Sequence, residues 1–518
     1  FYSANGSKLN FNGATTVNMY KGVAFHGATS DFTAGSGTSL YNGMSNVTVE
    51  LKDNGVNLGV FKGANLSWKG NTDTTYVNGI KNIPHVHAIN TGNYWYSSSL
   101  ENGTLTVETD VDRDSISSGA TRGDGFNDIQ MERERVILQG GKTIKSLAGR
   151  GLILASNKDA TKNSESGYTL KKGTVDISNG ANPTTGVYVN FGHIVTEKTA
   201  TDEGIIKVSK GVAAYGVNGS KIQNEGTVKV VSSDATNPGV GIMLLAKTDG
   251  KTETYGIANN KAAAGSKWME IVNKGTIDIT GTNAIGIYAK NNHTAAATRA
   301  LSTIYNEAPI ELGDQGKAIV VQTTNTEGAT LTLKDSGRTT TSQDIKVGKE
   351  GIGVYAEYSD VKFDGNYGIV IEDDGIAVQA KGVGKIEKTG ATDKLNVEYK
   401  GAAAKTAMAL AYTGVLNTDT FTNDINLNLT NTGNAKTLVG IYASGLGTLT
   451  NNGDITVEND GTYGILSKGV DIVNAGTIKV GKTTSTDSDA LGIYVENAKL
   501  TTDGDKLKVQ GNGGTNNK

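Results

Sequence analysis

Hydrophobic and polar residues alternate along most of this chain in a repeat that has two halves. The first half reads apolar-x-Asn-x-Gly-x-apolar-x-apolar, and the second is a short Gly-apolar-Tyr run. Self-similarity at a spacing of tens of residues is typical of a stacked array of equivalent units. The clearest copies of the first half are Ile222–Val230, Ile271–Ile279, Leu449–Val457 and Ile472–Val480, and those of the second are Gly186–Tyr188, Gly286–Tyr288, Gly353–Tyr355, Gly440–Tyr442 and Gly492–Tyr494.

The spacing of the copies indicates one coil of a parallel β-solenoid. Gly440, Gly464 and Gly492 open successive Gly-apolar runs that are 24 and 28 residues apart, which is shorter than a propeller blade of roughly 40–45 residues. Within each copy the apolar side chains lie two apart, so they face one side of a strand and the intervening Thr, Asp or Lys faces the other. The pattern therefore predicts an all-β parallel β-helix with inserted loops, of about 20 coils and roughly 100 Å if few residues are inserted.

The repeated asparagines and tyrosines have a structural and a functional interpretation. Glycine two positions after Asn is expected to supply a positive φ at the corner of each coil. Asparagines at equivalent corners can bond their amides to one another, as in cross-β ladders, and this interpretation is favoured over a row of ligands. The repeated tyrosines are likewise expected to be stacked surface or core more than a binding platform. The predicted corner ladder consists of Asn224, Asn273, Asn451 and Asn474.

The regularity of the repeat divides the chain into zones. We expect irregular N-terminal β-helix coils or a cap at 1–70, an atypical inserted or tip segment at 71–135, regular β-helix repeats with loop insertions at 136–510, and a linker at 511–518. Polar or Ala-rich stretches within the regular zone predict loops that project from the rod. These stretches lie near 247–268, 291–303, 322–348 and 388–406.

Composition favours a location outside the cytosol. It has 69 Gly, 4 Pro, no Cys and a net charge of −3. The balanced charge gives no electrostatic argument for nucleic acid or an anionic membrane surface. The lack of Cys favours a chain that crosses a bacterial envelope unfolded. No apolar stretch is long enough for a membrane helix, and the chain begins at Phe1 without a secretory signal, so we expect a processed or excised piece of a longer protein.

Two short motifs in the atypical zone are candidate binding residues. Tyr94, Trp95 and Tyr96 are adjacent aromatics in a Gly/Ser/Asn-rich stretch; aromatic faces stack on sugars and anchor protein interfaces, although they could instead close an end of the core. The tripeptide Arg122-Gly123-Asp124 is of the integrin-binding type, but such tripeptides also arise by chance in long chains rich in Gly and Asp.

Signals for metal binding or catalysis are weak. His85 and His87 would share one face of a strand, with no obvious third ligand nearby, so surface or packed histidines are favoured. Asp110, Asp112 and Asp114 have the spacing of a calcium loop, but the EF-hand positions for Gly and Glu are Ser115 and Thr121. None of the histidines lies in a recognisable protease signature. We expect no enzyme, no cofactor and no resident metal.

The paired repeat resembles a known family. The runs Ala284–Ala289 (AIGIYA) and Leu438–Ala443 (LVGIYA), together with Asn-x-Gly-x-Ile-x-Val, are similar to the passenger domains of very large type V autotransporter adhesins. The RadD-like group of fusobacterial outer-membrane autotransporters is the most similar, over about residues 136–500. The resemblance implies a right-handed β-helix at the bacterial cell surface, anchored in the outer membrane only through a barrel domain outside this chain.

The resemblance also implies a function in attachment and virulence. Such passengers mediate coaggregation with other bacteria and adhesion to host cells, through galactose-type sugars, bacterial surface proteins or host receptors. The matched motif is scaffold, so it carries no binding residue over to this chain. We therefore expect an adhesin, with loops on a rigid rod as its binding elements. The alternatives are a structural stalk whose binding tip lies elsewhere and, less favoured, a β-helix enzyme that degrades polysaccharides.

Overall fold

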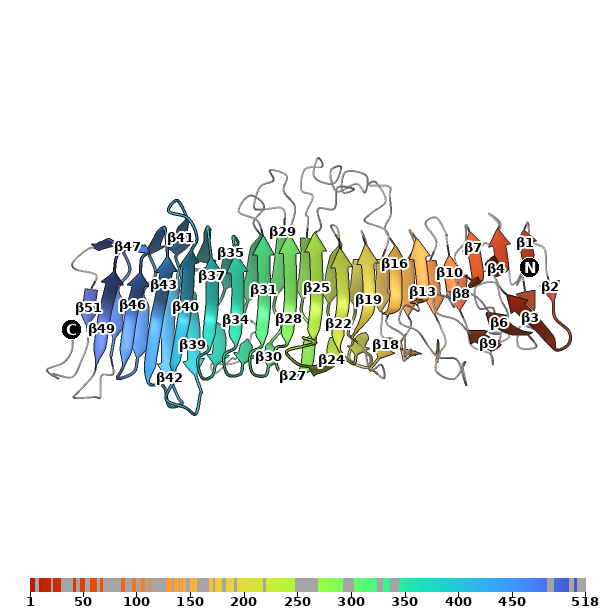
Figure 1. The fold of residues 1–518 in the computed structure, drawn as a ribbon, viewed down its shortest axis with the longest axis horizontal. Helices are drawn as coiled ribbons and strands as arrows, with labels where there is room; N and C mark the ends of the chain where they lie inside the picture. The colour runs from red at the N-terminus through yellow and green to blue at the C-terminus, as the bar shows by residue number, and fades with distance from the viewer. Residues whose placement is uncertain are drawn as a thin grey trace.

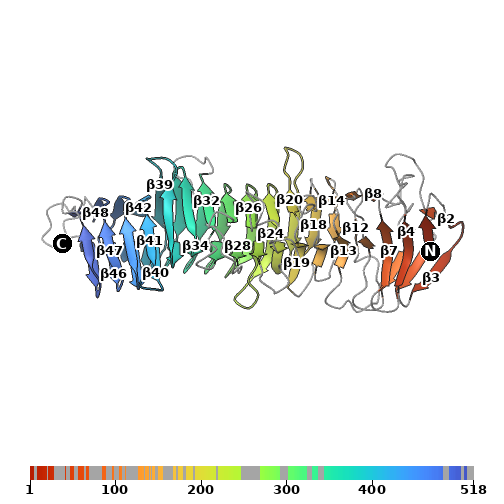
Figure 2. The same ribbon diagram turned by 90° about the horizontal axis from the view of Figure 1, so that it is seen from above.

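The fold is a long rod built of strands, with the first and the last described strands at opposite ends of the rod (Figures 1 and 2). No helix occurs among the residues that the structure, a computed structural model, describes. These are residues 1–4, 9–19, 22–28, 41–42, 47–51, 56–62, 66–68, 85–88, 96–98, 104–107, 111–112, 127–132, 135–138, 140–141, 143–145, 150–155, 167–170, 173–178, 183–190, 193–217, 220–246, 269–291, 302–323, 329–335, 344–481, 489–502 and 507–509.

Three long parallel sheets form the rod, and the chain visits them in turn, once per coil. The result is a right-handed parallel β-helix, as the repeat and the resemblance predict. Among the described residues, sheet 1 has 14 strands. They are β10 (Tyr96–Ser98), β13 (Asn127–Glu132), β16 (Arg150–Ala155), β19 (Thr184–Asn190), β22 (Gly211–Val217), β25 (Val240–Ala246), β28 (Ile285–Asn291), β31 (Lys317–Thr323), β34 (Ile352–Glu357), β37 (Ile376–Lys381), β40 (Thr406–Gly414), β43 (Thr437–Gly445), β46 (Thr462–Lys468) and β49 (Ala490–Glu496).

Sheet 2 follows sheet 1 in each coil, and sheet 3 completes the coil. The strands of sheet 2 are β8 (Leu66–Trp68), β11 (Thr104–Val107), β14 (Arg135–Leu138), β17 (Gly167–Leu170), β20 (His193–Thr196), β23 (Lys221–Asn224), β26 (Met269–Asn273), β29 (Ser302–Asn306), β32 (Thr330–Lys334), β35 (Asp360–Asp364), β38 (Gly384–Lys388), β41 (Thr420–Asn423), β44 (Thr448–Asn451), β47 (Asp471–Asn474) and β50 (Leu500–Thr502). Those of sheet 3 are β12 (Val111–Asp112), β15 (Thr143–Lys145), β18 (Thr174–Ile177), β21 (Ile205–Val208), β24 (Thr227–Ser233), β27 (Thr276–Gly281), β30 (Ile310–Leu312), β33 (Ile345–Val347), β36 (Tyr367–Ile371), β39 (Lys394–Tyr399), β42 (Asn426–Asn431), β45 (Ile455–Glu458), β48 (Ile478–Val480) and β51 (Leu507–Val509).

The core of the rod consists of the inward-facing apolar rows of the three sheets. Val228 and Val230 of β24 are fully buried, while Lys229 between them faces outward. They pair in register with Ile277 and Ile279 of the next coil, so each apolar side chain stacks on another. Because the coils whose side chains are described repeat this arrangement, the apolar rows run along the rod, and the period-two pattern of the sequence accounts for them.

The glycine of the Asn-x-Gly corner has a different role from the one predicted. The expectation of a positive φ is wrong, because Gly226, Gly275 and Gly453 are not among the glycines with positive φ. A Cβ atom at Gly275 would collide with the carbonyl oxygen of Gly226, and one at Gly453 with that of Ile425. Glycine is therefore needed there for the close approach of successive coils.

Positive φ occurs at other corners of the coil, on glycines such as Gly382 and Gly469 after strands of sheet 1 and also on residues other than glycine. Four of the latter lie at the corner between sheet 3 and sheet 1. Asn283, Gln315, Glu350 and Asp374 have φ values of 55°, 57°, 56° and 56°. Their side chains form an exposed row, in which Asn283 Nδ2 donates to Gln315 Oε1 at 2.9 Å and Gln315 Nε2 donates to Glu350 Oε2 at 3.0 Å. Glycine follows three of these residues, at 316, 351 and 375.

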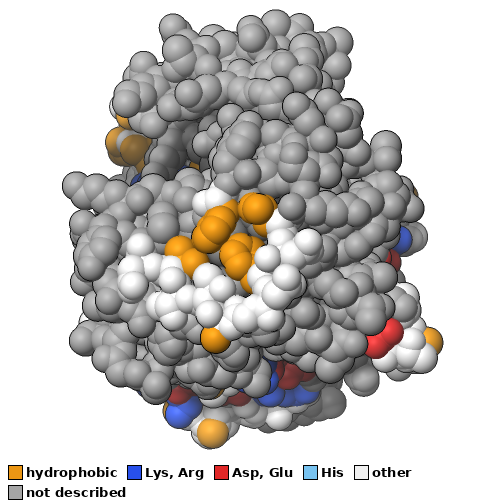
Figure 3. All heavy atoms as spheres, turned by 90° about the vertical axis from the view of Figure 1, so that its right-hand side faces the viewer, with side chains coloured by type: hydrophobic (Ala, Val, Ile, Leu, Met, Phe, Trp, Pro, Cys, Tyr) orange, Lys and Arg blue, Asp and Glu red, His pale blue; other side chains and the backbone are white. Residues whose placement is uncertain are grey.

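The N-terminal region forms shorter parallel sheets. Apolar side chains gather at the centre of this end of the rod (Figure 3). Phe1 and Phe11 contact each other edge to face with ring centroids 5.1 Å apart, and Phe11 also packs against the core. The strands of this region are β1 (Tyr2–Ala4), β4 (Gly22–Ala28) and β7 (Val56–Lys62) in one sheet, β2 (Leu9–Asn10) and β5 (Tyr41–Asn42) in a second, and β3 (Thr15–Met19), β6 (Val47–Leu51) and β9 (His85–Ala88) in a third.

Three of the predicted segments differ from the strand arrangement. The loop insertion predicted near 322–348 contains β32 of sheet 2 and β33 of sheet 3. Within 71–135, for which the sequence predicts an inserted or tip segment, the strands β10 to β13 join the three long sheets. Residues 388–406, predicted as a loop insertion, contain β39 of sheet 3. The alternation of Leu395, Val397 and Tyr399, all buried, is hidden in the sequence by the Lys and Asp around it.

Candidate binding surface

The outer faces of the three sheets differ in chemistry. Sheets 2 and 3 present mostly polar side chains, such as Thr330, Thr332 and Lys334 of β32 or Lys394, Asn396 and Glu398 of β39. Sheet 1 presents apolar and aromatic side chains on its outer face. Figure 1 views the rod from the side of sheet 1, and no described strand covers this face. Apolar side chains gathered on one side of a protein commonly mark an interaction site.

The aromatic row is the first of three parallel rows on this face. It comes from the Tyr position of the Gly-apolar-Tyr repeat, which the register aligns from coil to coil. Most of its members are partly exposed, and the exposed fraction of Tyr494 reaches 43%. In order along the rod the row consists of Tyr188, Tyr215, Met243, Tyr288, Val320, Tyr355, Gln379, Ala411, Tyr442, Leu466 and Tyr494.

The aliphatic row lies three residues earlier on each strand. The intervening glycine and apolar residue, as in Gly353 and Val354, are both buried. A Cβ atom at Gly353 would meet the carbonyl oxygen of Ala377 and the side chain of Ile369, which explains why this position of the repeat is Gly. The row consists of Val212, Val240, Ile285, Lys317, Ile352, Ile376, Met408, Val439, Tyr463 and Leu491.

The polar row lies two residues after the aromatic row and borders the apolar surface. Glu357 accepts a hydrogen bond from Lys381 Nζ at 2.7 Å and one from the Tyr355 hydroxyl at 3.3 Å. The Tyr288 hydroxyl donates to Gln322 Oε1 at 2.8 Å. The row consists of Lys290, Gln322, Glu357, Lys381, Thr413, Ser444, Lys468 and Glu496. An apolar centre with a polar border is the usual anatomy of a protein interface.

The environment of this face favours the neutral form of Tyr288 and Tyr355. Burial raises the pKa of Tyr288 and of Tyr355, and the negative charge of Glu357 raises both further. The hydrogen bond to Glu357 raises the pKa of Lys381. These two neutral phenol rings lie near the ion pair of Glu357 and Lys381, and this arrangement is suited to noncovalent contact.

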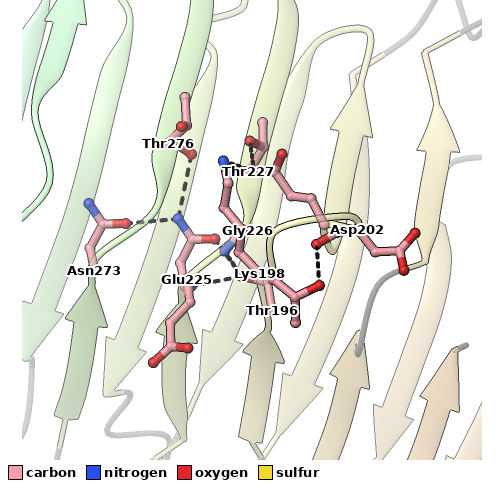
Figure 4. Close-up of polar contacts among 11 residues, drawn as sticks. Thr196, Lys198, Asp202, Glu225, Gly226, Thr227, Asn273 and Thr276 are labelled. Carbon is pink, nitrogen blue, oxygen red and sulfur yellow. Dashed lines mark hydrogen bonds and ion pairs between the residues drawn. The ribbon is translucent and has the colours of Figure 1, made fainter. Parts of the chain in front are cut away.

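The corner asparagines are hydrogen bonded to one another between coils. Asn224 Nδ2 donates to Asn273 Oδ1 at 2.8 Å, and Asn273 Nδ2 donates to Asn306 Oδ1 at 2.7 Å. The row begins at Thr196, which donates to Asn224 Oδ1 and accepts from the backbone N–H groups of residues 225 and 226 (Figure 4). The three asparagine side chains are at most 1% exposed, so the row is part of the scaffold and closed to a ligand.

A second row of corner asparagines lies toward the C-terminus. Asn423 Nδ2 donates to Asn451 Oδ1, and Asn451 Nδ2 donates to Asn474 Oδ1, both at 2.8 Å. Sequence reasoning missed Asn306 and Asn423, because neither has Gly two positions later. Their signal is Asn at the end of a short strand, two residues after a buried Ile304 or Phe421.

The predicted binding motifs lie mostly outside the described residues. Tyr94, Trp95 and the tripeptide Arg122-Gly123-Asp124 are not described. Tyr96 begins β10 and pairs with Ile129 of β13, and its side chain is not described. His85 and His87 lie on β9, paired with Thr48 and Glu50.

Three successive coils have long connections at the corner between sheet 1 and sheet 2. The chain leaves β25 at Ala246 and enters β26 at Met269, and it leaves β28 at Asn291 and enters β29 at Ser302. In the next coil it leaves β31 at Thr323 and enters β32 at Thr330. Most of the connecting residues, 247–268, 292–301 and 324–328, lie outside the described part. Their attachment points share one edge of the rod.

No site for a metal ion was found among the described residues. The same part of the chain contains no helix that is long and apolar enough to cross a membrane. In comparisons with known proteins, no family model matches the chain, and neither the curated proteins nor the solved structures include a match.

Proposed function

We propose that the chain is the surface-exposed passenger rod of a bacterial type V autotransporter adhesin, which attaches the cell to host cells or to other bacteria. The observation that carries this proposal is the β-helix rod with an apolar outer face and a cluster of long connections at one corner. Such a rod is suited to attachment because it is stiff and because each coil needs contacts only with its neighbours.

The geometry of the rod supports display of binding elements. The strands of sheet 1 alone span about 60 Å at the usual separation of strands, so elements on the rod are held away from its ends. Long connections on a solenoid commonly lie on the binding face. The three attachment points between sheets 1 and 2 are in adjacent coils, so the segments 247–268, 292–301 and 324–328 start from neighbouring positions.

The partners that fit this proposal are a host receptor protein, a galactose-type glycan or a surface protein of another bacterium. Aromatic side chains such as Tyr94, Trp95 and Tyr96 would stack on sugar rings or anchor a protein contact. The tripeptide Arg122-Gly123-Asp124 would serve an integrin-type receptor. Anchoring in the outer membrane would come from a part of the protein outside this chain.

Whole-cell binding by the full chain tests the proposal. One variant replaces residues 247–268 with the three residues 218–220 that connect β22 to β23 in the preceding coil. A second variant carries Tyr94→Ser and Trp95→Ser, and a third carries Asp124→Ala. Lys229→Gln, which removes an ion pair with Asp278 on the outer face of sheet 3, is the control. Galactose, N-acetylgalactosamine and arginine serve as competitors.

The expected result is saturable binding by the full chain and by the control, with loss of binding in at least one of the three variants while the circular-dichroism spectrum and melting temperature hold. If all three variants still bind cells, the residues that contact the cell lie elsewhere on the rod. An intact chain that binds no cell would support a stalk and overturn the proposal.

A further inference from the structure

We propose that the outer face of sheet 1 between β28 and β49 is a self-association surface, on which two copies of the chain pack face to face with antiparallel rod axes. This inference does not rest on the proposed adhesive function. It rests on the order of side chains along the aromatic, aliphatic and polar rows. These rows read almost the same from either end, and a twofold-symmetric contact requires this property.

The symmetry operator follows from the rows. The twofold axis runs parallel to the strands and lies between β37 and β40. It places each strand of one copy opposite the strand of the second copy that lies at the same distance from the axis on its other side. The strand directions then stay aligned, as in ordinary packing of one sheet on another. The opposing strands are β28 with β49, β31 with β46, β34 with β43, and β37 with β40.

The aromatic row matches itself under this operation. Of the three outer pairs, two place a tyrosine opposite a tyrosine and one places an aliphatic residue opposite another. The central pair places a small residue opposite a polar one. Aromatic pairs contribute beyond their buried area when they stack offset or edge to face. The facing pairs are Tyr288 with Tyr494, Val320 with Leu466, Tyr355 with Tyr442, and Gln379 with Ala411.

The aliphatic row matches in the same register. Its one charged member, the exposed Lys317, falls opposite Tyr463, where an ammonium group can contact the face of an aromatic ring. The other pairs are entirely apolar, and of their members Val439 is buried beneath its neighbours, with 1% of its surface exposed. The facing pairs are Ile285 with Leu491, Lys317 with Tyr463, Ile352 with Val439, and Ile376 with Met408.

The polar row disfavours a shift of the register in one direction, and the aromatic row disfavours the other, which would place Tyr494 opposite Val320. Lys290 falls opposite Glu496, and no two like charges meet in the other pairs, which are Gln322 with Lys468, Glu357 with Ser444, and Lys381 with Thr413. A shift of one coil in one direction brings Lys290 opposite Lys468 and the two copies of Lys381 together. Like charges across an interface suppress the wrong arrangement, while opposite charges favour the right one.

The area is sufficient for a specific dimer. Eight strands at the usual spacing cover about 38 Å, and the three rows cover about 17 Å along a strand. The footprint is about 650 Å² on each copy and about 1,300 Å² in total, which lies within the range of standard protein–protein interfaces. A second copy fits better than a narrow ligand, because the partner has to be as long, flat and apolar as this face.

Sedimentation velocity of the full chain over a concentration series, at low ionic strength, tests the proposal. We expect a monomer–dimer equilibrium. Lys290→Glu and Glu496→Lys each place like charges at two symmetric contacts, so each alone should raise the dissociation constant about tenfold. An equimolar mixture of the two variants should recover the wild-type affinity, because the mixed dimer has opposite charges at both contacts.

A matched pair of substitutions separates the proposed face from the rest of the rod. Tyr355→Lys on the outer face of sheet 1 should abolish dimers, and Tyr305→Lys on the outer face of sheet 2 should leave them intact. The mixing experiment excludes misfolding as the cause, since a misfolded variant would not be rescued by the other. A chain that stays monomeric at every concentration, single variants that dimerise like the wild type, or a mixture that is not rescued would each overturn the proposal.

Discussion

Replacing Asn451 with Leu tests whether the corner asparagines stabilise the rod as a coupled row. Asn451 Nδ2 donates to Asn474 Oδ1 at 2.8 Å and to the carbonyl oxygen of Gly453 at 2.9 Å, and Asn451 Oδ1 accepts from Asn423. Asn451→Leu removes all three bonds. Asn423 Nδ2 keeps its bond to the carbonyl oxygen of Ile425 at 3.1 Å, but the two acceptors lose the donor that Asn451 supplies.

The magnitude follows from these lost partners. A buried acceptor left without its donor costs about 1–3 kcal/mol, so two of them give an expected loss of about 3 kcal/mol in the free energy of unfolding. Asn452→Leu is the matched control, since the neighbouring Asn452 is exposed and bonds Asp424 on the surface. A surface change of this kind is expected to stay within about 0.5 kcal/mol.

The triple replacement of Asn423, Asn451 and Asn474 by Leu tests the coupling itself. It removes donors and acceptors together, and replacing both partners of a buried hydrogen bond by apolar groups can be nearly neutral. The equivalent position in two other coils is already apolar, as Asn306 pairs with Leu333 and Leu333 with Phe363, and the latter two are 0% exposed. The triple replacement should therefore cost clearly less than the three single replacements added together.

The assay is denaturant unfolding of the full chain followed by circular dichroism, with hydrogen exchange of the strands β41, β44 and β47 to locate the effect. Exchange should accelerate around β44 in the single variant. A triple variant that costs as much as the sum of the singles would refute the reasoning, because the amides would then be independent of one another.

Two further predictions concern the scaffold. Gly453→Ala should destabilise the rod by about 2–4 kcal/mol, because its Cβ atom would meet the carbonyl oxygen of Ile425, whereas Gly13→Ala, which has open space around it, should be neutral in the same unfolding assay. Burial raises the pKa of three core tyrosines, Tyr367, Tyr399 and Tyr412, above the ordinary value of 10.0. Above pH 10 the unfolded chain therefore releases protons that the folded chain retains, and the stability of the fold decreases as the pH rises. Phenolate absorbance should show these three tyrosines titrating only as the circular-dichroism signal is lost.

The sequence repeat is sufficient to predict the β-helix coil and the rows of inward-facing apolar side chains. A period of two along a short strand depends only on residues that are neighbours in the sequence. Asn224, Asn273, Asn451 and Asn474 were identified because Gly two positions later marks the corner. The reason for that Gly could not be read from the sequence, since the close carbonyl belongs to the preceding coil, as for Gly453 and Ile425.

The apolar outer face of sheet 1 was not predicted, because insertions conceal the register between coils. Tyr215 and Tyr288 are 73 residues apart in the sequence, yet only one strand, with Met243, lies between them in sheet 1. Where such insertions occur, equivalent residues of successive coils are no longer about two dozen residues apart in the sequence. The row becomes visible only when the strand pairing places these side chains side by side.

The most direct test of the attachment function is capture of cells by microbeads coated with the full chain. The account predicts that coated beads bind host cells or partner bacteria in a saturable manner, and that free chain in solution competes with them. Beads coated with an unrelated protein of similar charge should bind none. If coated beads bind no more cells than these controls, the chain is not an attachment rod and its outer surfaces serve another purpose.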